Sequence, residues 1–466
     1  MLVMGLSLVS PVRAQTPDLT GTLSGISGIS APEKATGSTV ETLCPKLSPT
    51  STGGVGDLQI RCTEMIGNSL SGNTSAASVP LLPLAPEEIA GQGKSAVETS
   101  NRNIGTRLAT LRGGVTNLGL RRFALQNDAP APAMPYTLVA SLAPFAPSSV
   151  VAASTPSNFS RLGLFANGTF TGGDKDVSGQ EAGFDYQTFG LTLGADYRFT
   201  DNFVLGATFN YLSNDIDFDT TAINNTQSGG GIDTQSFGFS LYSTYYVSNQ
   251  FYVDGIFSFG SNNYDIDRRI SYSIPSTNRM GMLIPGTTTV SQTATGDTNS
   301  TQYSISVGVG YDFNVQGFTI TPLARLEYSR INIDGYQEAI NNTANGFGLA
   351  LAFNDQHVDS LVSVLGAQAS YAISTGIGVL LPQLRVEWRH EFENDARSIT
   401  SRFVNDPART PLVLGTDDPD RDFVILGTSL SATFRGGVAA FVSYETVVGL
   451  VRVSAHSVVG GIRLEF

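Results

Sequence analysis

The sequence predicts an all-β protein, a transmembrane antiparallel β-barrel of about 12 strands preceded by a small α-helical N-terminal region and a Pro/Ala-rich linker. From residue 158 onward, apolar and polar residues alternate with a period of two, as in β-strands. The chain has 14% charged residues, 50 glycines and a mean hydropathy of +0.02, and it contains no apolar run that would suit a spanning helix. Its formal net charge of −13 argues against a nucleic-acid partner, which requires basic patches.

Residues 1–14 have the pattern of a secretory signal peptide. An apolar stretch leads to Val12, Arg13 and Ala14, and we expect cleavage before Gln15. The basic segment that normally opens such a signal is missing, so we expect the true start codon to lie upstream. An ordinary apolar N-terminus is the alternative interpretation. Residues 15–40 are rich in Gly, Ser, Thr and Pro, which predicts a flexible linker.

Residues 41–113 are predicted to form a small helical region. Apolar and small polar residues recur there at steps of three and four, at Val97, Asn101, Ile104, Leu108 and Leu111. Cys44 and Cys62 are the two cysteines of the chain, and in an exported protein we expect them to form one disulfide. Two free thiols, or half of a metal site, are the alternatives, and no histidine lies near either cysteine in the sequence. Residues 114–157 contain many prolines and are predicted to form a second linker.

The strand faces indicate which solvent surrounds the barrel at 158–466. In "FGLTLGADYRF" (189–199), one face carries Phe, Leu, Ala and Tyr, and the other carries Gly, Thr, Asp and Arg. We count about twelve such segments, each near the ~9–11 residues that a tilted strand needs to cross a bilayer. The polar face is mostly Gly, Ser and Thr, and aromatic residues gather at strand ends, as in the aromatic girdles of membrane barrels. The apolar face is therefore predicted to contact lipid.

The connections between these segments alternate in length. Short turns are expected near residues 201, 249, 316, 375 and 436, and long loops at about 171–183, 219–232, 267–298, 334–356 and 394–421. Outer-membrane barrels show this asymmetry, with short periplasmic turns and long extracellular loops. With an even number of strands, both ends of the barrel domain lie on the short-turn side.

Four stretches resemble the autotransporter β-domain family, the outer-membrane translocators of type V secretion. They are "LGADYRFTDNFVLGATFNY" (193–211), "TPLARLEYSRINIDGYQEA" (321–339), "PQLRVEWRHEFEND" (382–395) and "GGIRLEF" (460–466). The resemblance implies a bacterial outer-membrane barrel that carries an N-terminal region to the cell surface. It also implies that the barrel-assembly machinery reads the last strand, so the assembly signal would comprise Phe466, Leu464 and Ile462. The chain departs from the family pattern because its N-terminal region is short and contains no β-helix repeats.

We therefore expect a non-enzymatic translocator that presents or threads a short N-terminal region. The expected partners are outer-membrane lipid and the assembly machinery, with no nucleic acid and a monomeric barrel. Two alternatives remain open. A surface adhesion, structural or porin-like barrel would act through its long loops, chiefly the one at 271–300. An outer-membrane hydrolase would need a nucleophile and a base converging at the barrel mouth.

Charged residues in two strands are predicted to face the lumen, because a charge at the midplane of the lipid face costs about 2–4 kcal/mol. These residues are Arg325, Glu327, Arg385, Glu387, Arg389 and Glu391. One interpretation is a structural salt-bridge network that fills a narrow pore. The other is a constriction that grips the N-terminal segment or selects solutes.

Two further groups of polar residues are less informative. The acidic stretches "NDIDFD" (214–219), "NYDID" (263–267) and "DDPDRD" (417–422) could supply oxygen ligands to Ca²⁺ or Mg²⁺, but they lack the EF-hand glycine and distal Glu. We interpret them as solvated loop acids and expect no metal and no cofactor. His357, His390 and His456 lie on separate predicted strands, and the sequence contains no G-x-S-x-G, H-E-x-x-H or phosphate-loop motif. We expect no catalytic residue, and a lipid-interface position for His456.

Overall fold

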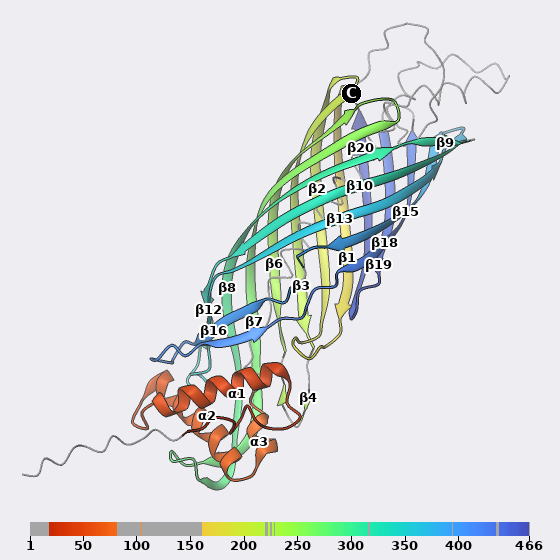
Figure 1. Cartoon of the computed structure of the whole chain (residues 1–466). Helices are drawn as coiled ribbons and strands as arrows, with labels where there is room; N and C mark the ends of the chain where they lie inside the picture. Colours follow the sequence, from red (N-terminus) through yellow and green to blue (C-terminus); the bar gives the residue numbers. More distant parts are fainter. Residues whose placement is uncertain are drawn as a thin grey trace, which may run out of the picture.

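The computed structural model describes residues 18–81, 104, 161–219, 222–223, 226–227, 229–315, 317–393, 395–434 and 438–465. Twelve of the strands in these residues form a closed antiparallel barrel, in which β20 pairs with β1 (Figure 1). The barrel strands are β1 (Leu162–Lys175), β2 (Phe184–Thr200), β3 (Phe203–Phe218), β6 (Gly230–Tyr246), β7 (Phe251–Thr277), β8 (Leu283–Tyr311), β10 (Phe318–Ile333), β13 (Gln356–Tyr371), β15 (Gly378–Glu391), β18 (Asp422–Phe434), β19 (Val438–Val448) and β20 (Val453–Glu465). The predicted fold class is confirmed.

The two faces of the barrel wall differ as the alternation predicts. On β2, Phe189 is 54% exposed and Leu193 is 47% exposed, whereas Thr188, Thr192 and Asp196, at the alternate positions, are buried. Outward-facing apolar side chains continue around the wall, and their exposure is that of a surface made to contact lipid. The inward-facing side chains are mostly polar or small.

The connections also follow the predicted asymmetry. Short turns such as 201–202 and 247–250 lie at one end of the barrel, and the long loops lie at the other end. Two of the long loops form a separate four-stranded sheet of β11 (Tyr336–Gln337), β12 (Leu351–Phe353), β16 (Ser398–Phe403) and β17 (Leu412–Gly415). The remaining short strands are β4 (Ala222–Ile223), β5 (Thr226–Gln227), β9 (Phe313–Val315) and β14 (Ile373–Thr375).

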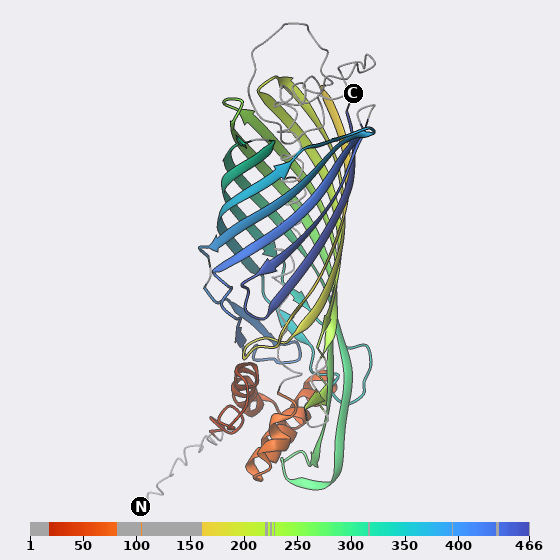
Figure 2. The same cartoon turned by 90° about the vertical axis from the view of Figure 1, so that its right-hand side faces the viewer.

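The prediction of a long loop at 267–298 is wrong. These residues extend β7 and β8 into a two-stranded hairpin that projects beyond the barrel, so that β7 has 27 residues and β8 has 29 (Figure 2). The physical reason is a period-two pattern, in which Ile270, Tyr272 and Ile274 are buried on one face and serines between them are not. This face packs against the N-terminal helices.

The N-terminal region contains α1 (Ala31–Leu43), the short 3₁₀ helix η1 (Cys44–Lys46), α2 (Gly53–Leu70) and α3 (Thr74–Ser78). The prediction of a flexible linker over 15–40 is wrong for the described part of that range. Ser30 and Glu33 form a capping box that starts α1, Pro32 occupies its first turn, and Leu23 is fully buried.

Of the helix predicted around residue 104, only Ile104 lies within the described residues, and it is helical. The predicted signal peptide at 1–14 and the linker at 114–157 lie outside the described residues.

Residues 18–81 form a cap on the long-loop end of the barrel (Figures 1 and 2). The cap shares one hydrophobic core with the barrel strands and loops beneath it: Leu58 and Met65 of α2 belong to the same buried cluster as Tyr272 of β7 and Leu349 of the loop after β10. Helix α2 is buried on nearly every face. None of the described helices is both long enough and apolar enough to cross a membrane.

Candidate functional site in the lumen and cap

Charged side chains from three strands form a network inside the barrel. Arg325 of β10 lies 2.5 Å from Glu327 and 3.3 Å from Glu387 of β15. Arg389 of β15 continues the chain, 3.2 Å from Glu327 and 4.0 Å from Glu387. Each of these charged side chains has an oppositely charged neighbour. The ion pairs therefore compensate the charges that the alternating pattern of the strands turns into the lumen.

Arg385 extends this network to a residue that the sequence reading missed. Its guanidinium lies 3.7 Å from Glu387 and donates to Glu445 of β19. Glu445 is the one acidic residue of β19 and lies two residues after Ser443, so it faces the lumen as Ser443 does. This alternation could have identified Glu445 from the sequence. The sixth predicted residue, Glu391, lies at the end of β15 and accepts hydrogen bonds from the Ser360 hydroxyl (2.6 Å) and the Leu361 amide (2.9 Å).

An aromatic socket lies near the short-turn end of the lumen. Ile104 is fully buried there, in a cluster with Phe165, Val204, Tyr242, Tyr246, Tyr252 and Ile256. Inward-facing glycines make room for the rings: a Cβ on Gly206 would lie 2.2 Å from the ring of Tyr242, and one on Gly310 would lie 2.0 Å from the Tyr252 hydroxyl. The space that the missing Cβ atoms leave is occupied by the Tyr242 and Tyr252 rings, which pack close to the backbone of the wall.

The cap is fixed to the barrel loops through buried polar groups of α2. Asp57 accepts hydrogen bonds from the amides of Gly346 (3.1 Å) and Gly348 (2.8 Å) in the loop after β10, and it lies 3.4 Å from Arg61. Arg61 also pairs with Glu64 at 2.6 Å. Burial raises the pKa of the Glu64 carboxyl, although Arg61 opposes that shift.

The hairpin of β7 and β8 forms the other side of the cap's contact surface. The Asn68 side chain donates to the carbonyl of Pro275 at 3.0 Å, and the Thr288 hydroxyl donates to Glu64 at 2.9 Å. Gly67 of α2 approaches Gly281 so closely that a Cβ on Gly67 would lie 2.2 Å from the Gly281 carbonyl oxygen. Helix and hairpin are thus in backbone contact.

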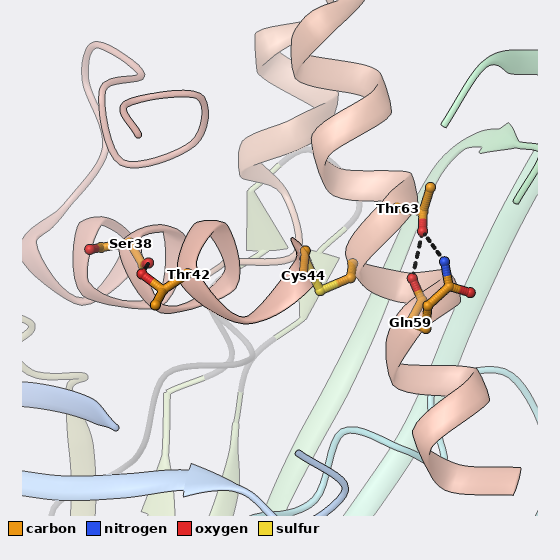
Figure 3. The surroundings of a disulfide bond; sticks show 6 residues. Ser38, Thr42, Cys44, Gln59 and Thr63 are labelled. Carbon is orange, nitrogen blue, oxygen red and sulfur yellow. Dashed lines mark hydrogen bonds between the residues drawn. A yellow bond between two sulfur atoms is a disulfide. The ribbon is translucent and has the colours of Figure 1, made fainter. Parts of the chain in front are cut away.

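The disulfide joins the two main helices of the cap. Cys44, at the end of α1, is bonded to Cys62 in α2, with their Cα atoms 5.7 Å apart, which confirms the predicted pairing (Figure 3). Next to it, Thr63 binds Gln59 twice within α2, by accepting from the side-chain amide (2.8 Å) and donating to the main-chain carbonyl (2.6 Å). The cap is therefore cross-linked between α1 and α2.

The acidic stretches and histidines lie away from the lumen. Asp215, Asp233, Asp265 and Asp297 occupy directly opposed positions on four neighbouring strands of the outer wall. Across the part of the chain that the structure describes, no three His, Cys, Asp or Glu side chains are placed to hold a metal ion. In the stretch at 417–422, the acids instead tie loops together, as where Asp420 accepts from the amide of Val451 at 2.8 Å.

Two of the histidines lie on the outer wall. The His456 ring stacks on Tyr444, and the Tyr444 hydroxyl lies 2.8 Å from its Nδ1 atom. His390 Nδ1 lies 2.9 Å from Asp422, which also accepts the indole N–H of Trp388 at 3.1 Å. Aromatic rings with one polar partner are typical of the edge of a membrane belt. His357, the third, pairs with Asn332 across β13 and β10.

A lipid-exposed wall, a lumen of paired charges and a docked N-terminal cap define a transmembrane β-barrel that holds its own N-terminal region at one end. The family described as autotransporter beta-domain matches residues 164–445, more than half of the chain. The chain belongs to that family, whose members are barrels of the bacterial outer membrane.

A solved structure shares the fold, and two curated proteins are similar to part of the sequence. The translocator domain of autotransporter NalP from Neisseria meningitidis is 17% identical, with a TM-score of 0.50 over 66% of this chain and 90% of that one. An uncharacterized protein in the trpE-trpG intergenic region of Pseudomonas putida is 31% identical over 119 residues, and Outer membrane protein A of Rickettsia rickettsii is 30% identical over 121 residues. Those segments are 24% and 26% of this chain but only 18% and 5% of the two relatives, so the chain spans a small part of their length.

Proposed function

We propose that this barrel translocates its own short N-terminal region through the lumen and keeps it as a docked cap on the cell surface. The observation that carries the proposal is the position of Ile104. In sequence it lies between the cap, which ends at Leu81 on the long-loop end, and β1, which begins at Leu162 on the short-turn end. In space it lies inside the barrel, in the aromatic socket.

Three points along the chain therefore trace a route from one barrel end to the other. The cap is at the long-loop end, Ile104 is inside the lumen and β1 starts at the short-turn end. A connection that ran around the outside of the barrel would not place Ile104 in the lumen. With the long loops facing outward, as in outer-membrane barrels, the cap lies on the cell surface.

In this proposal the lumen charge network is structural and does not hold the N-terminal segment. Its three guanidinium groups are matched by the three carboxylates of Glu327, Glu387 and Glu445, so it adds no net charge to the pore. Charges that are paired with one another bind a passing polypeptide less strongly than unpaired charges would. The aromatic socket around Ile104 binds the segment instead.

The proposed partners are outer-membrane lipid and the barrel-assembly machinery, acting on a monomeric barrel. Ile462 and Leu464 of the last strand face outward, 56% and 38% exposed, where a recognition factor can reach them. Phe466, the third residue of the predicted assembly signal, lies outside the described residues. We further propose that the barrel has no enzymatic activity, in keeping with its membership of the autotransporter beta-domain family.

Paired cysteines test the proposed route. Ile104→Cys combined with Val204→Cys should cross-link in cells with a short bifunctional maleimide, because both side chains lie in the socket. The matched control is Ile104→Cys with Leu205→Cys, one residue further along β3 and facing outward (38% exposed). Cross-linking of the first pair alone supports the proposal. Cross-linking of neither pair, with both proteins assembled, contradicts it.

A further inference from the structure

The tip of the β7–β8 hairpin carries an apolar patch on the part of the molecule farthest from the membrane-spanning wall (Figure 2). Met280 is 85% exposed, Met282 59%, Leu283 44% and Ile284 43%. Leu70, one turn beyond the contact of Gly67 with Gly281, is 68% exposed and adds to it. We call these five residues the tip patch. Unlike the outward apolar residues of the barrel wall, the tip patch lies outside the membrane belt, and soluble surfaces rarely expose so many large apolar side chains together.

The charge around the tip patch differs from the charge of the whole chain. The formal net charge is −13, yet residues 269–296 contain two arginines and no Asp or Glu. Arg279 is exposed and donates to the carbonyl of Pro49 at 2.9 Å. The cap segment that it contacts, residues 46–56, contains no acid. Arg279 therefore places a positive charge on the rim of the tip patch, and residues 270–296 add no negative charge to it.

We infer that the tip patch inserts into the surface of a second, anionic lipid bilayer, beyond the membrane that holds the barrel. Apolar side chains on a narrow tip enter the boundary between headgroups and acyl chains, and a basic rim is attracted to anionic headgroups. Methionine suits such a contact because its unbranched side chain adapts to an irregular apolar surface.

The structure holds the tip rigid enough for insertion. The turn at 278–282 is closed by the Asn278 side chain, which accepts from the amides of Met280 (2.9 Å) and Met282 (3.1 Å). The close approach of Gly67 to Gly281 supports the turn from behind. The apolar side chains are therefore presented outward by a fixed backbone, which lowers the entropic cost of binding. In a cell, this inference rests on the outward orientation given in the proposed function.

Vesicle flotation tests the inference without depending on that orientation. The full chain, held in a nanodisc of zwitterionic lipid, is mixed with vesicles of phosphatidylcholine alone or with added phosphatidylserine. We expect co-flotation with the anionic vesicles only. Replacing Met280, Met282 and Leu283 with serine should weaken binding more than about tenfold, because apolar burial provides most of the interfacial attraction. Arg279→Gln should weaken it on the order of fivefold.

The matched control replaces Val177 and Val451 with serine; both are exposed loop residues, 60% and 66%, at the same barrel end but outside the tip patch. Unchanged amide exchange in α2 shows that each variant keeps its cap. Equal binding of the tip variant and the control would overturn the inference, as would equal binding to both kinds of vesicle. Self-association lost in the tip variant, without vesicle binding by the unsubstituted protein, would identify a second copy as the occupant and would also overturn it. Failure of the cross-linking test above would leave these results unaffected.

Discussion

A single methyl group at Gly67 should separate the cap from the hairpin. In an ordinary exposed helix, Gly→Ala stabilises by up to about 1 kcal/mol. Here the new Cβ would lie 2.2 Å from the Gly281 carbonyl oxygen and 3.0 Å from its Cα, and both are backbone atoms that cannot rotate away. The helix or the hairpin must therefore move by roughly 1 Å to reach ordinary contact distance, and overpacking of this kind costs about 1–3 kcal/mol.

That displacement also strains the neighbouring polar contacts. Asn68, the next residue in α2, donates to the Pro275 carbonyl at 3.0 Å, and a shift of ~1 Å would break that bond. Its loss adds about 1 kcal/mol. After subtracting the gain in helix propensity, we expect Gly67→Ala to destabilise cap docking by roughly 1–3 kcal/mol.

Hydrogen exchange of the detergent-solubilised protein measures this effect, as faster exchange of α2 amides and of the hairpin near residues 270–286. Gly54→Ala is the matched control, because the three atoms nearest its Cβ all belong to the Asn405 side chain, which can rotate aside at the cost of one hydrogen bond to the Gly348 carbonyl. The control should show a smaller loss or a gain. Slower exchange in Gly67→Ala would show that helix propensity outweighs the backbone contact, contrary to this prediction.

Three other perturbations have expected outcomes. Cys44 and Cys62 are 18 residues apart, and replacing both with serine should lower the stability of the cap, measured by amide exchange, by about 3 kcal/mol while the barrel stays folded. Unchanged exchange would show that packing alone stabilises the cap. Burial raises the folded-state pKa of Glu64 above its ordinary value of 4.5, so its contribution favours the folded cap below that pH and is lost as the pH rises through the raised pKa. Glu64→Gln should remove this pH dependence from the amide exchange of the cap, and identical exchange profiles for the two proteins would count against it. Asp233→Asn should raise barrel stability in urea by a few tenths to about 1 kcal/mol, because Asp233 is directly opposed by Asp215 and Asp265 across the outer wall, and a loss of stability would contradict that repulsion.

The barrel could be predicted from the sequence because each strand displays its environment locally. Alternation alone identified the lipid face and directed Arg325 and Arg385 into the lumen. The partners inside the lumen could not be predicted in the same way. Arg385 meets Glu445 across β18. Phe165 of β1 reaches Tyr242 of β6 because the two strands between them carry Gly194 and Gly206 beneath the rings. Such contacts depend on strand order and register around the barrel and not on local pattern.

The errors have different causes. Ser30 and Glu33 have the spacing of a capping box, which indicates a helix start. The Gly- and Ser-rich composition around them led instead to the prediction of a linker. At residues 267–298, the many serines and threonines suggested a loop, although Tyr272 and Ile274 alternate with them in a strand pattern. In both places the apolar residues are buried by a partner that is distant in the chain, so the cap and the hairpin stabilise each other.

The side of the outer membrane on which the cap lies decides whether the N-terminal region is translocated. An epitope inserted in the exposed cap segment at residues 48–50 can be probed with antibody and protease on intact cells. We predict full access to the epitope without damage to the outer membrane, with the cap still attached to the barrel. Protection that is lost only when the outer membrane is broken would place the cap in the periplasm and would contradict the proposed translocation.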